Sequence, residues 1–443
     1  MVSGGVQIKG ARPPIPVMPR IEVSVGAGTT LMVEGRAEAE ILGGRVEVFG
    51  LEAGPGFKAR IDLYKAAPFH VLEDARIAVE GGKAWAVEGD TIPGSWRELA
   101  ERVVSEKPRK IMVVGPVDVG KSGLVTFLVN RLAASGLRAA VVDADTGQSD
   151  IGPPTTIGLG IAERPVVMLG EIPLYDAFFV GLTSPSGLIH RSVAGVTVMA
   201  ERGLSLGADT VIVDTTGWVY DPGGRDLKIS KAVSLRPDLI VAVDRGGALA
   251  HLTRFLSRLF DVVAVEPAVR LRPRSREERR EIRRTTYGRY LAGARDVEIG
   301  FEDIASGYSF AFSGEPLPRE ELEAIAGILG VEVYYGEASG DSIVIFVGAP
   351  VPQAGLDLLA SLYEKKYVKA FTGPELAHTL VAFGDREKMF RGLGVIKHVD
   401  PRRRVVTVYT PVEPREGMYM QLGYIKVNPA TLEEEGWIEK WSI

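Results

Sequence analysis

One eight-residue segment constrains the fold of this chain more than any other. Residues 115–122 read GPVDVGKS and fit the pattern GxxxxGK[ST]; they follow the apolar run KIMVV and lead into the helical run SGLVTFLVNRL. A glycine-rich loop between a strand and a helix offers unpaired backbone N–H groups and a helix N-terminus to an anion. The segment therefore predicts an α/β domain that binds the phosphates of a nucleoside triphosphate, and the alternative is a chance glycine-rich turn.

The pattern also assigns roles within the loop. Lys121 is placed to reach the β- and γ-phosphates, and the hydroxyl of Ser122 is placed to ligate Mg²⁺. Gly123 offers no hydroxyl to the α-phosphate, so weaker binding is expected there. The predicted nucleotide-binding residues of the loop are Gly115, Pro116, Val117, Asp118, Val119, Gly120, Lys121, Ser122 and Gly123.

The surrounding sequence predicts a doubly wound parallel sheet. Between about residues 108 and 266, helical segments alternate with the apolar runs KIMVV, RAAVVDA, PVVML, TVIVDTT, LIVAV and DVVAV. Runs that are apolar on both faces are typical of parallel strands with helices on each side. Just before them SWRELAERVV has helical spacing, with Ser95 as the expected N-cap.

The flanking regions are predicted to be mainly β. From about residue 29 to 89 short runs alternate apolar and polar side chains, and the pairs Gly43-Gly44 and Gly81-Gly82 are placed for hairpin turns. Towards the C-terminus, runs such as SIVIFVGA, TLVAFG and RVVTVYT indicate further strands. The expected division is an N-terminal β domain at 1–94, a P-loop domain at 95–299 with an arginine-rich lid at about 270–292, and a C-terminal mainly β domain at 300–443.

Composition narrows the functional classes. A net charge of −5 argues against a general nucleic-acid coat, so contact with RNA or DNA is expected from a local basic patch. The absence of cysteine excludes disulfides and thiolate metal sites and favours a reducing, cytoplasmic setting. Because no run reaches about 18 apolar residues, no membrane span is expected.

Two predicted strands end in aspartates at the edge where open α/β sheets bind ligands. Asp143 and Asp145 close the run VVDAD, and Asp214 closes VIVD. Asp145 is the candidate base for an attacking hydroxyl and a candidate Mg²⁺ contact, with an Asx-turn ahead of Gly147 as the alternative. Asp143 is equally suited to a structural role, in which it caps a turn or holds the P-loop by hydrogen bonds.

The segment DTTGW allows two interpretations. Asp214 with Gly217 looks like the γ-phosphate sensor of a GTPase switch, but no [NT]KxD segment for reading guanine is present. Trp218, directly after a glycine, is placed to stack on a base, an interaction of about 1–3 kcal/mol. Simple packing is the alternative for Trp218.

The segment at 270–290 is strongly basic, with nine Arg against three Glu. From Ser275 onward it is predicted to be helical, with Glu278 completing a capping box. A row of arginines on one face is suited to neutralising a transferring phosphoryl group, whereas a solvated basic face is the alternative. The arginines that share this face are Arg276, Arg279, Arg280 and Arg283.

Together these segments resemble the polynucleotide 5′-hydroxyl kinase family, which includes the RNA kinase subunit of eukaryotic tRNA-splicing and pre-mRNA cleavage complexes, and especially its archaeal members. The resemblance rests on GPVDVGKS, DADTGQSDIGPPTTIGLG, DTTGWV and RSREERREIRRTTYGRYLAG, which occur in the family's order. It covers the middle domain closely and the flanking domains only in their layout.

The resemblance implies roles for further residues. Asp145 would activate the 5′-hydroxyl, with Gln148 near the substrate and Trp218 stacked on the terminal base. A threonine of the substrate clasp falls loosely on Thr183. The implied lid arginines are Arg274 at the nucleotide and the catalytic pair Arg279 and Arg283.

The expected activity is transfer of the γ-phosphate of ATP or GTP to the 5′-hydroxyl of RNA, with DNA as a second acceptor, Mg²⁺ as cofactor and RNA-processing proteins as partners. One alternative is a nucleotide-bound assembly factor without turnover, which has no need of Asp145 or the arginine lid. Another is an ATPase or GTPase switch built on Asp214 and Gly217, which would hydrolyse nucleotide without RNA.

Overall fold

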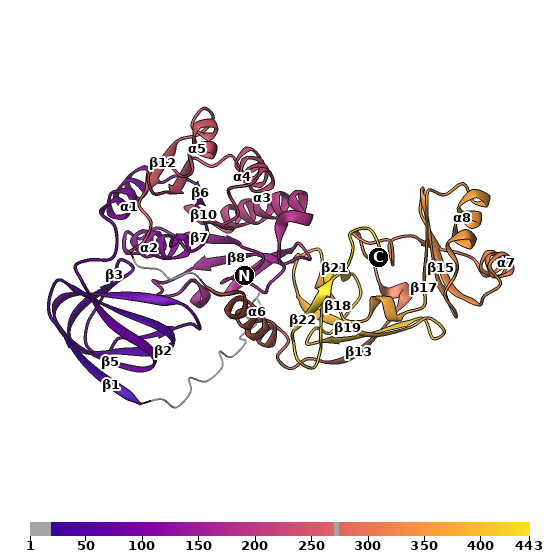
Figure 1. Ribbon diagram of the computed structural model, residues 1–443, viewed down its shortest axis with the longest axis horizontal. Helices are drawn as coiled ribbons and strands as arrows, with labels where there is room; N and C mark the ends of the chain where they lie inside the picture. Colours follow the sequence, from indigo (N-terminus) through magenta and orange to yellow (C-terminus); the bar gives the residue numbers. More distant parts are fainter. Residues whose placement is uncertain (1–18, 270–273) are drawn as a thin grey trace. The chain divides into compact units, whose positions relative to one another are not determined.

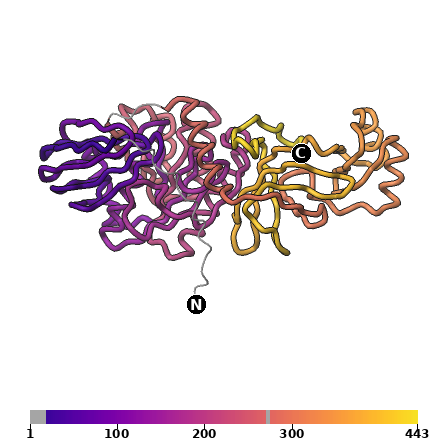
Figure 2. The backbone as a smooth tube through the Cα atoms, turned by 90° about the horizontal axis from the view of Figure 1, so that it is seen from below, coloured from indigo at the N-terminus to yellow at the C-terminus, as the bar shows by residue number. Residues whose placement is uncertain are grey.

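The computed structural model describes residues 19–269 and 274–443, which form two compact units. The first unit comprises the chain up to residue 180 together with 184–283, and the second comprises 181–183 together with 284–443. Figure 2 follows the backbone through each unit. The N-terminal β region and the P-loop region thus share one unit, and the boundaries at 94 and 299 stay predictions.

A seven-stranded sheet forms the centre of the first unit (Figure 1). Its order is β12-β11-β6-β10-β7-β8-β9, and the strands from β12 to β7 run parallel. Because β6 and β7 both pair with β10, the carboxyl ends of these three strands meet at one edge, where open sheets bind ligands. The strands are β6 (Lys110–Val114), β7 (Ala139–Ala144), β8 (Thr156–Ala162), β9 (Leu174–Phe179), β10 (Thr210–Thr215), β11 (Leu239–Val243) and β12 (Val262–Val265).

Helices cover this sheet because its central strands are apolar on both faces. Every residue of β10 and β11 is buried, as expected for parallel strands with helices above and below. Helix α1 packs on α2, and α3 packs on α4 (Figure 1). The helices are α1 (Gly94–Glu106), α2 (Lys121–Ala134), α3 (Ile189–Ser205), α4 (Pro222–Leu235), α5 (Ala250–Leu256) and α6 (Arg276–Tyr290), which continues into the second unit.

The predicted doubly wound P-loop fold is confirmed, but the strand predicted at PVVML is wrong. Asn130 holds this segment as an irregular loop, since its side chain bonds the N–H and the carbonyl of Val166, each at 2.8 Å. Val167 and Met168 then pack into the core of the N-terminal sheet, so the apolar run fills a space between sheets. The sequence did not predict β8 and β9, which extend the sheet beyond β7 by antiparallel pairing and leave β9 at its edge.

The N-terminal region is a five-stranded antiparallel sheet, as predicted, but its glycine pairs do not form hairpin turns. Both pairs lie inside long strands, where Gly44 and Gly82 have φ of +79° and +61°. A Cβ on Gly44 would lie 2.2 Å from the carbonyl oxygen of Asp74, so glycine permits close approach of two bent strands. The strands are β1 (Arg20–Val25), β2 (Thr29–Val48), β3 (Leu51–Ala53), β4 (Lys58–Ile61) and β5 (Ala66–Glu88).

The second unit contains two sheets, and the strands predicted at SIVIFVGA, TLVAFG and RVVTVYT are confirmed as β16, β18 and β20. A six-stranded sheet has the order β13-β20-β19-β18-β21-β22, and a four-stranded sheet has the order β14-β15-β16-β17. Helices α7 and α8 pack on each other and on the smaller sheet. The elements are β13 (Arg295–Gly300), β14 (Glu315–Pro316), α7 (Arg319–Leu329), β15 (Val333–Ala338), β16 (Ser342–Val347), α8 (Gln353–Leu362), β17 (Tyr367–Phe371), β18 (Thr379–Gly384), β19 (Gly392–Asp400), β20 (Val405–Thr410), β21 (Tyr419–Val427) and β22 (Glu434–Trp437).

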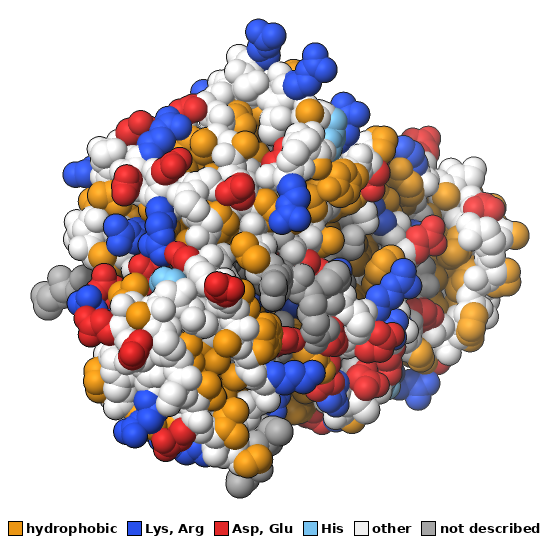
Figure 3. Space-filling model, turned by 60° about the vertical axis from the view of Figure 1, so that its left-hand side comes forward, with side chains coloured by type: hydrophobic (Ala, Val, Ile, Leu, Met, Phe, Trp, Pro, Cys, Tyr) orange, Lys and Arg blue, Asp and Glu red, His pale blue; other side chains and the backbone are white. Residues whose placement is uncertain are grey.

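Short 3₁₀ turns complete the secondary structure, at Leu169–Glu171, Pro185–Gly187, Phe301–Asp303 and Pro374–Leu376. Within the described part of the chain, no helix is long and apolar enough to cross a bilayer. On the face shown in Figure 3, basic and acidic side chains are interspersed, so that face has no large area of a single charge, although the chain has a net charge of −5.

Candidate active site

The phosphate loop joins β6 to α2 and is shaped by two residues with positive φ. Gly120 adopts a φ of +92°, and Asp118 adopts +57°. The segment DTTGW lies directly against the loop, because a Cβ on Gly217 would be only 2.5 Å from the backbone nitrogen of Val117. The loop and the end of β10 therefore form one continuous surface.

Lys121 opens helix α2 and is almost fully buried. Its Nζ donates a hydrogen bond of 2.6 Å to the carbonyl oxygen of Pro116 within the loop. Burial lowers the pKa of Lys121, and the negative charges of Asp214 and Asp145 oppose this effect. A buried ammonium with one carbonyl partner is suited to pairing with the phosphates of a nucleotide.

Ser122 and Asp214 form a pair suited to a hard cation. The Ser122 hydroxyl donates a hydrogen bond of 2.6 Å to Oδ2 of Asp214, while the buried Oδ1 has no hydrogen-bond partner among the described residues. Burial raises the pKa of Asp214 to about 6. In the described chain no cluster of three or more His, Asp or Glu could hold a metal. Hydroxyl and carboxylate oxygens are hard ligands of the kind that Mg²⁺ prefers.

Asp143, at the end of β7, organises the loop that follows it. Its carboxylate accepts hydrogen bonds from the backbone N–H of Asp145, the N–H of Ile151 and the hydroxyl of Ser149. Burial raises its pKa well above the ordinary value. These contacts support the structural role for Asp143 and fix the backbone from which Asp145 extends.

Asp145 forms the Asx-turn that the sequence allowed as one alternative, and its role as base stays a prediction. Its Oδ1 accepts hydrogen bonds of 3.1 Å from the N–H groups of Gly147 and Gln148, which is an Asx-turn. Oδ2 has no hydrogen-bond partner within residues 19–269 and 274–443. The turn therefore orients the carboxylate and leaves one oxygen available to accept a proton.

The start of the arginine-rich helix α6 contacts the phosphate loop. The Arg279 guanidinium pairs with Asp118 at 3.3 Å, and the Arg279 carbonyl oxygen accepts a 3.4 Å bond from the Gln148 side chain. The predicted capping box is present, since Ser275 and Glu278 exchange hydrogen bonds of 2.8 and 3.1 Å. The structure thus brings part of the predicted lid to the loop.

The other predicted lid arginines differ in their surroundings. The backbone N–H of Arg274 also faces Asp118, whereas its Nε donates to the carbonyl oxygen of Tyr64 in the N-terminal sheet region. Arg283 is half-buried on α6, and Arg276 and Arg280 are exposed. Residues 270–273 of the predicted lid lie outside the described residues.

The N-terminal sheet region reaches this site through residues that the sequence did not single out. Lys65 pairs with Asp150 at 2.6 Å, and both side chains are about 15% exposed. Asp150 belongs to the loop after Asp145, so the ion pair connects the sheet region to that loop. No motif marks Lys65, because a lone lysine carries no spacing signal.

Helix α2 also packs against the N-terminal sheet region. A Cβ on Gly123 would lie 3.0 Å from the ring of Phe49, whose carbonyl oxygen accepts a 2.9 Å bond from the Asn130 side chain. Gly123 therefore makes room for Phe49.

The prediction of Ser95 as N-cap of α1 is wrong. Helix α1 begins at Gly94 after Pro93, and the Ser95 hydroxyl accepts a hydrogen bond from the N–H of Glu266.

Trp218 is held in one orientation beside the loop. Its Nε1 donates a 2.6 Å hydrogen bond to Asp221, which also caps α4 through the N–H of Gly224. The indole is half-buried and lies over Gly223, where a Cβ would be 2.6 Å from the ring. Thr183 belongs to the second unit, and its role stays a prediction.

Two buried lysines of α4 lie behind the site. Lys228 donates a 3.0 Å bond to the Thr216 hydroxyl. The Nζ of Lys231 has no hydrogen-bond partner in the described chain, and burial lowers its pKa to about 8. The charges of Asp145 and Asp143 favour its protonated form, so Lys231 contributes positive potential beneath Asp145.

Comparison with known proteins places the chain among relatives of one family. A family model described as "mRNA cleavage and polyadenylation factor CLP1 P-loop" matches residues 115–293. A polyribonucleotide 5′-hydroxyl-kinase of Thermococcus kodakarensis is 32% identical over 339 residues, covering 76% of this chain and 93% of that protein. One from Pyrococcus furiosus is 30% identical with the same coverage. One from Methanocaldococcus jannaschii is 30% identical, covering 70% and 84%.

A solved structure supports the fold. The Clp1p chain in a complex with Pcf11p superposes with a TM-score of 0.62 at 13% identity, covering 92% of this chain and 98% of that one. At this identity the likeness concerns the fold alone. The match to the family model and the relatives confirm the resemblance that the sequence motifs indicated.

Proposed function

The chain belongs to the polyribonucleotide 5′-hydroxyl-kinase family, and we propose that it transfers the γ-phosphate of a nucleoside triphosphate to the 5′-hydroxyl of RNA. We further propose ATP as donor, with GTP as a second donor, and DNA as a second acceptor. The relatives named as kinases support the reaction class. The chain's own residues support the assignment of roles.

One observation carries the proposal: four elements bring complementary groups to the same phosphate loop. Lys121 begins α2, Asp214 ends β10, Asp145 follows β7 and Arg279 extends from α6. The contacts that join them are Ser122–Asp214, Arg279–Asp118, Gln148–Arg279 and the electrostatic influence of Asp145 on Lys121. A loop that only bound nucleotide would not require a carboxylate and an arginine helix as well.

In the proposed mechanism Asp145 is the base. Its free Oδ2 accepts the proton of the attacking 5′-hydroxyl while the Asx-turn holds the carboxylate in place. Lys121 and Arg279 neutralise charge on the transferring phosphoryl group. For Arg279 this requires exchange of Asp118 for phosphate, which a contact of 3.3 Å between partly exposed groups permits.

Ser122 and Asp214 fit Mg²⁺ as the metal of this reaction. The buried, unpartnered Oδ1 of Asp214 and the adjacent Ser122 hydroxyl would hold it. When bound, Mg²⁺ neutralises charge on the β- and γ-phosphate oxygens. Asp145 as a further metal contact remains part of the proposal.

Substrate selection is proposed to depend on the RNA end. Trp218, oriented by Asp221, offers a face to the terminal base, and Gln148 lies beside the loop of Asp145. Stacking is tolerant of sequence because every base has a π-face. Thr183 is retained as a proposed clasp residue.

The deciding experiment incubates the protein with γ-labelled ATP, Mg²⁺ and a 5′-hydroxyl oligoribonucleotide. The wild type should label the 5′ end, and Lys121→Ala and Asp145→Asn should each reduce labelling by about 10²-fold or more. Absence of 5′ label in the wild type would contradict the proposal. Binding without transfer would indicate an assembly factor, and hydrolysis without RNA would indicate a switch.

A further inference from the structure

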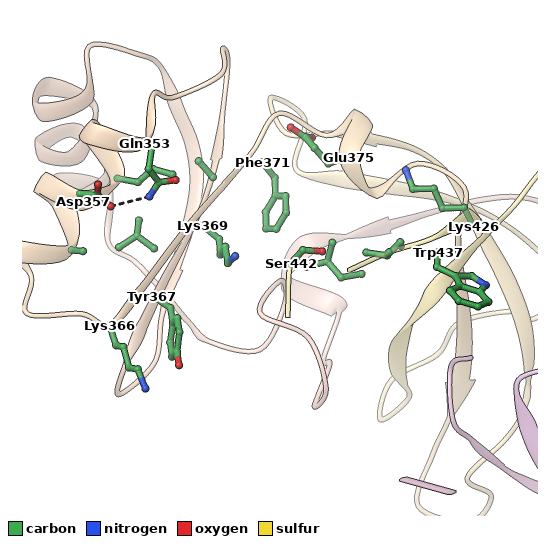
Figure 4. Close-up of a pocket in the computed structure, with 16 residues that line it drawn as sticks. Gln353, Asp357, Lys366, Tyr367, Lys369, Phe371, Glu375, Lys426, Trp437 and Ser442 are labelled. Carbon is green, nitrogen blue, oxygen red and sulfur yellow. Dashed lines mark hydrogen bonds between the residues drawn. The ribbon is translucent and has the colours of Figure 1, made fainter. Parts of the chain in front are cut away.

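The second unit contains a groove that the proposed chemistry does not use. Its volume is about 550 Å³, and it is bordered by α8 and β17 on one side and by β21, β22 and the last residues on the other (Figure 4). Both β17 and β22 are edge strands, since each pairs with one neighbour in its sheet. The groove is therefore open along two sheet edges.

Aromatic rings are exposed along this groove. Trp437 lines it and is 71% exposed, and Trp441 nearby is 53% exposed. Tyr367 lines the opposite side, where Phe310 supports its ring at 5.4 Å. Burying a tryptophan is normally favourable, so a ring left this exposed is available to a ligand.

Three lysines accompany the rings. Lys366, Lys369 and Lys426 line the groove, and Lys366 bonds the neighbouring Tyr367 hydroxyl and is attracted by Asp341. Lys366 and Lys369 also lie over aromatic rings, with Nζ at 5.0 Å from Tyr367 and 5.6 Å from Phe310. In Figure 4 the Lys369 side chain extends into the space between the two sides.

The two carboxylates of the groove are already occupied by the chain itself. Asp357 accepts a 2.8 Å bond from the Gln353 side chain. Glu375 accepts from the N–H groups of Thr372 and Gly373. The groove therefore presents lysines and aromatic rings beside carboxylates that are already bonded within the chain, and cations with aromatic rings are the combination that binds single-stranded nucleic acid.

We propose that this groove binds a single-stranded stretch of the RNA substrate away from its 5′ end. Bases stack on Trp437 and Tyr367, and phosphates pair with Lys366, Lys369 and Lys426. The identity of the ligand rests on the proposed kinase function. A peptide added to the β17 edge would use backbone hydrogen bonds and would not require an exposed tryptophan, so RNA accounts for more of the groove.

Binding of a 5′-phosphorylated RNA of about 20 nucleotides tests the groove, since single-strand sites span about 4–16 nucleotides. Trp437→Ala should weaken this binding by about 5- to 100-fold, and Lys369→Glu should weaken it and make it less sensitive to salt. Trp437→Phe should retain most of the affinity. Phe255→Ala, which removes an exposed ring from α5, is the matched control and should bind like the wild type.

Transfer to a 5′-hydroxyl dinucleotide provides the second measurement. The rate of this transfer should be unchanged in Trp437→Ala and Lys369→Glu, because the dinucleotide is too short to occupy a second site. Binding of the phosphorylated RNA does not depend on phosphate transfer. If the kinase proposal fails, the wild type will not label the dinucleotide, and this result is distinguishable from a change in RNA binding between the wild type and the groove variants. Unchanged affinity for the long RNA in Trp437→Ala and Lys369→Glu would overturn the groove proposal. If the groove variants instead lost binding of a protein partner and kept their affinity for RNA, the groove proposal would also be overturned, and the groove would be assigned to a peptide.

Discussion

The phosphate-loop site and the groove of the second unit place charge in opposite ways. Around the loop, Lys121, Asp143, Asp214 and Lys231 are buried, and burial shifts the pKa of each toward its neutral form. In the groove, Trp437 and Lys366 are exposed, Lys369 and Lys426 are half-buried, and the carboxylates are hydrogen-bonded within the chain. Buried charge is costly and is suited to chemistry at fixed positions, whereas exposed charge and rings suit contacts that tolerate many sequences.

The largest effect should come from Asp214. Asp214→Asn removes the charge that the free Oδ1 offers to a metal while preserving the shape of the side chain, so labelling of RNA should fall by about 10²- to 10³-fold. Partial recovery at high Mg²⁺ concentration is expected. Asp209→Asn, at an exposed backbone contact before β10, is a control of the same chemistry. Equal losses in both variants would point to folding instead of metal binding.

Glu337 tests whether burial of a carboxyl group in the second unit also lowers the free energy of unfolding. Burial raises its pKa to about 7 from an ordinary 4.5. The folded state then holds a proton that the unfolded state releases, so stability should fall as pH rises from about 4.5 to about 7 and level off above. Glu337→Gln should remove this pH dependence and raise the free energy of unfolding above pH 7 by about 3 kcal/mol. Thermal unfolding from pH 4.5 to 8 measures it, and an unchanged slope in the variant would exclude Glu337 as its source.

Lys231 tests whether buried charge near the loop serves function at the expense of stability. Lys231→Met keeps the length of the side chain and removes an ammonium without a hydrogen-bond partner, so unfolding should become harder by about 1–2 kcal/mol. Transfer should fall because Asp145 loses a nearby positive charge. Denaturant unfolding and RNA labelling are the two measurements. A variant that is more stable and fully active would show that Lys231 has no part in the reaction.

Asp118 should give the smallest effect. Asp118→Asn weakens the pair with Arg279, and partly exposed ion pairs contribute about 0–1 kcal/mol. Transfer should therefore change by a few-fold at most, with KM for nucleotide falling if release of Arg279 favours the phosphates. Steady-state kinetics with varied ATP reports the change. A loss of 10²-fold or more would assign Asp118 a direct role that the contact with Arg279 does not explain.

Much of the site could be predicted because its motifs are local. GPVDVGKS fixes a loop and a helix start within eight residues, and the capping box at Ser275 and Glu278 appears as expected. The run VVDAD with Gly147 predicts both a base and an Asx-turn at Asp145, and the turn orients the same carboxylate that is proposed as base. The sequence places Asp214 at the ligand-binding edge and suggests a switch role, but its pairing with Ser122 joins two segments far apart in sequence and leaves no local pattern.

The sequence by itself determined the P-loop, the parallel core strands, the arginine helix and the family, because each is a pattern of neighbouring residues that fixes backbone shape or charge. Only the tertiary structure decided that PVVML is a loop between sheets, that the glycine pairs lie inside strands, and that Lys65 reaches Asp150. It also decided that the groove of the second unit has edge strands on both sides. These features depend on contacts between residues distant in the chain, and such contacts leave no periodicity in the sequence.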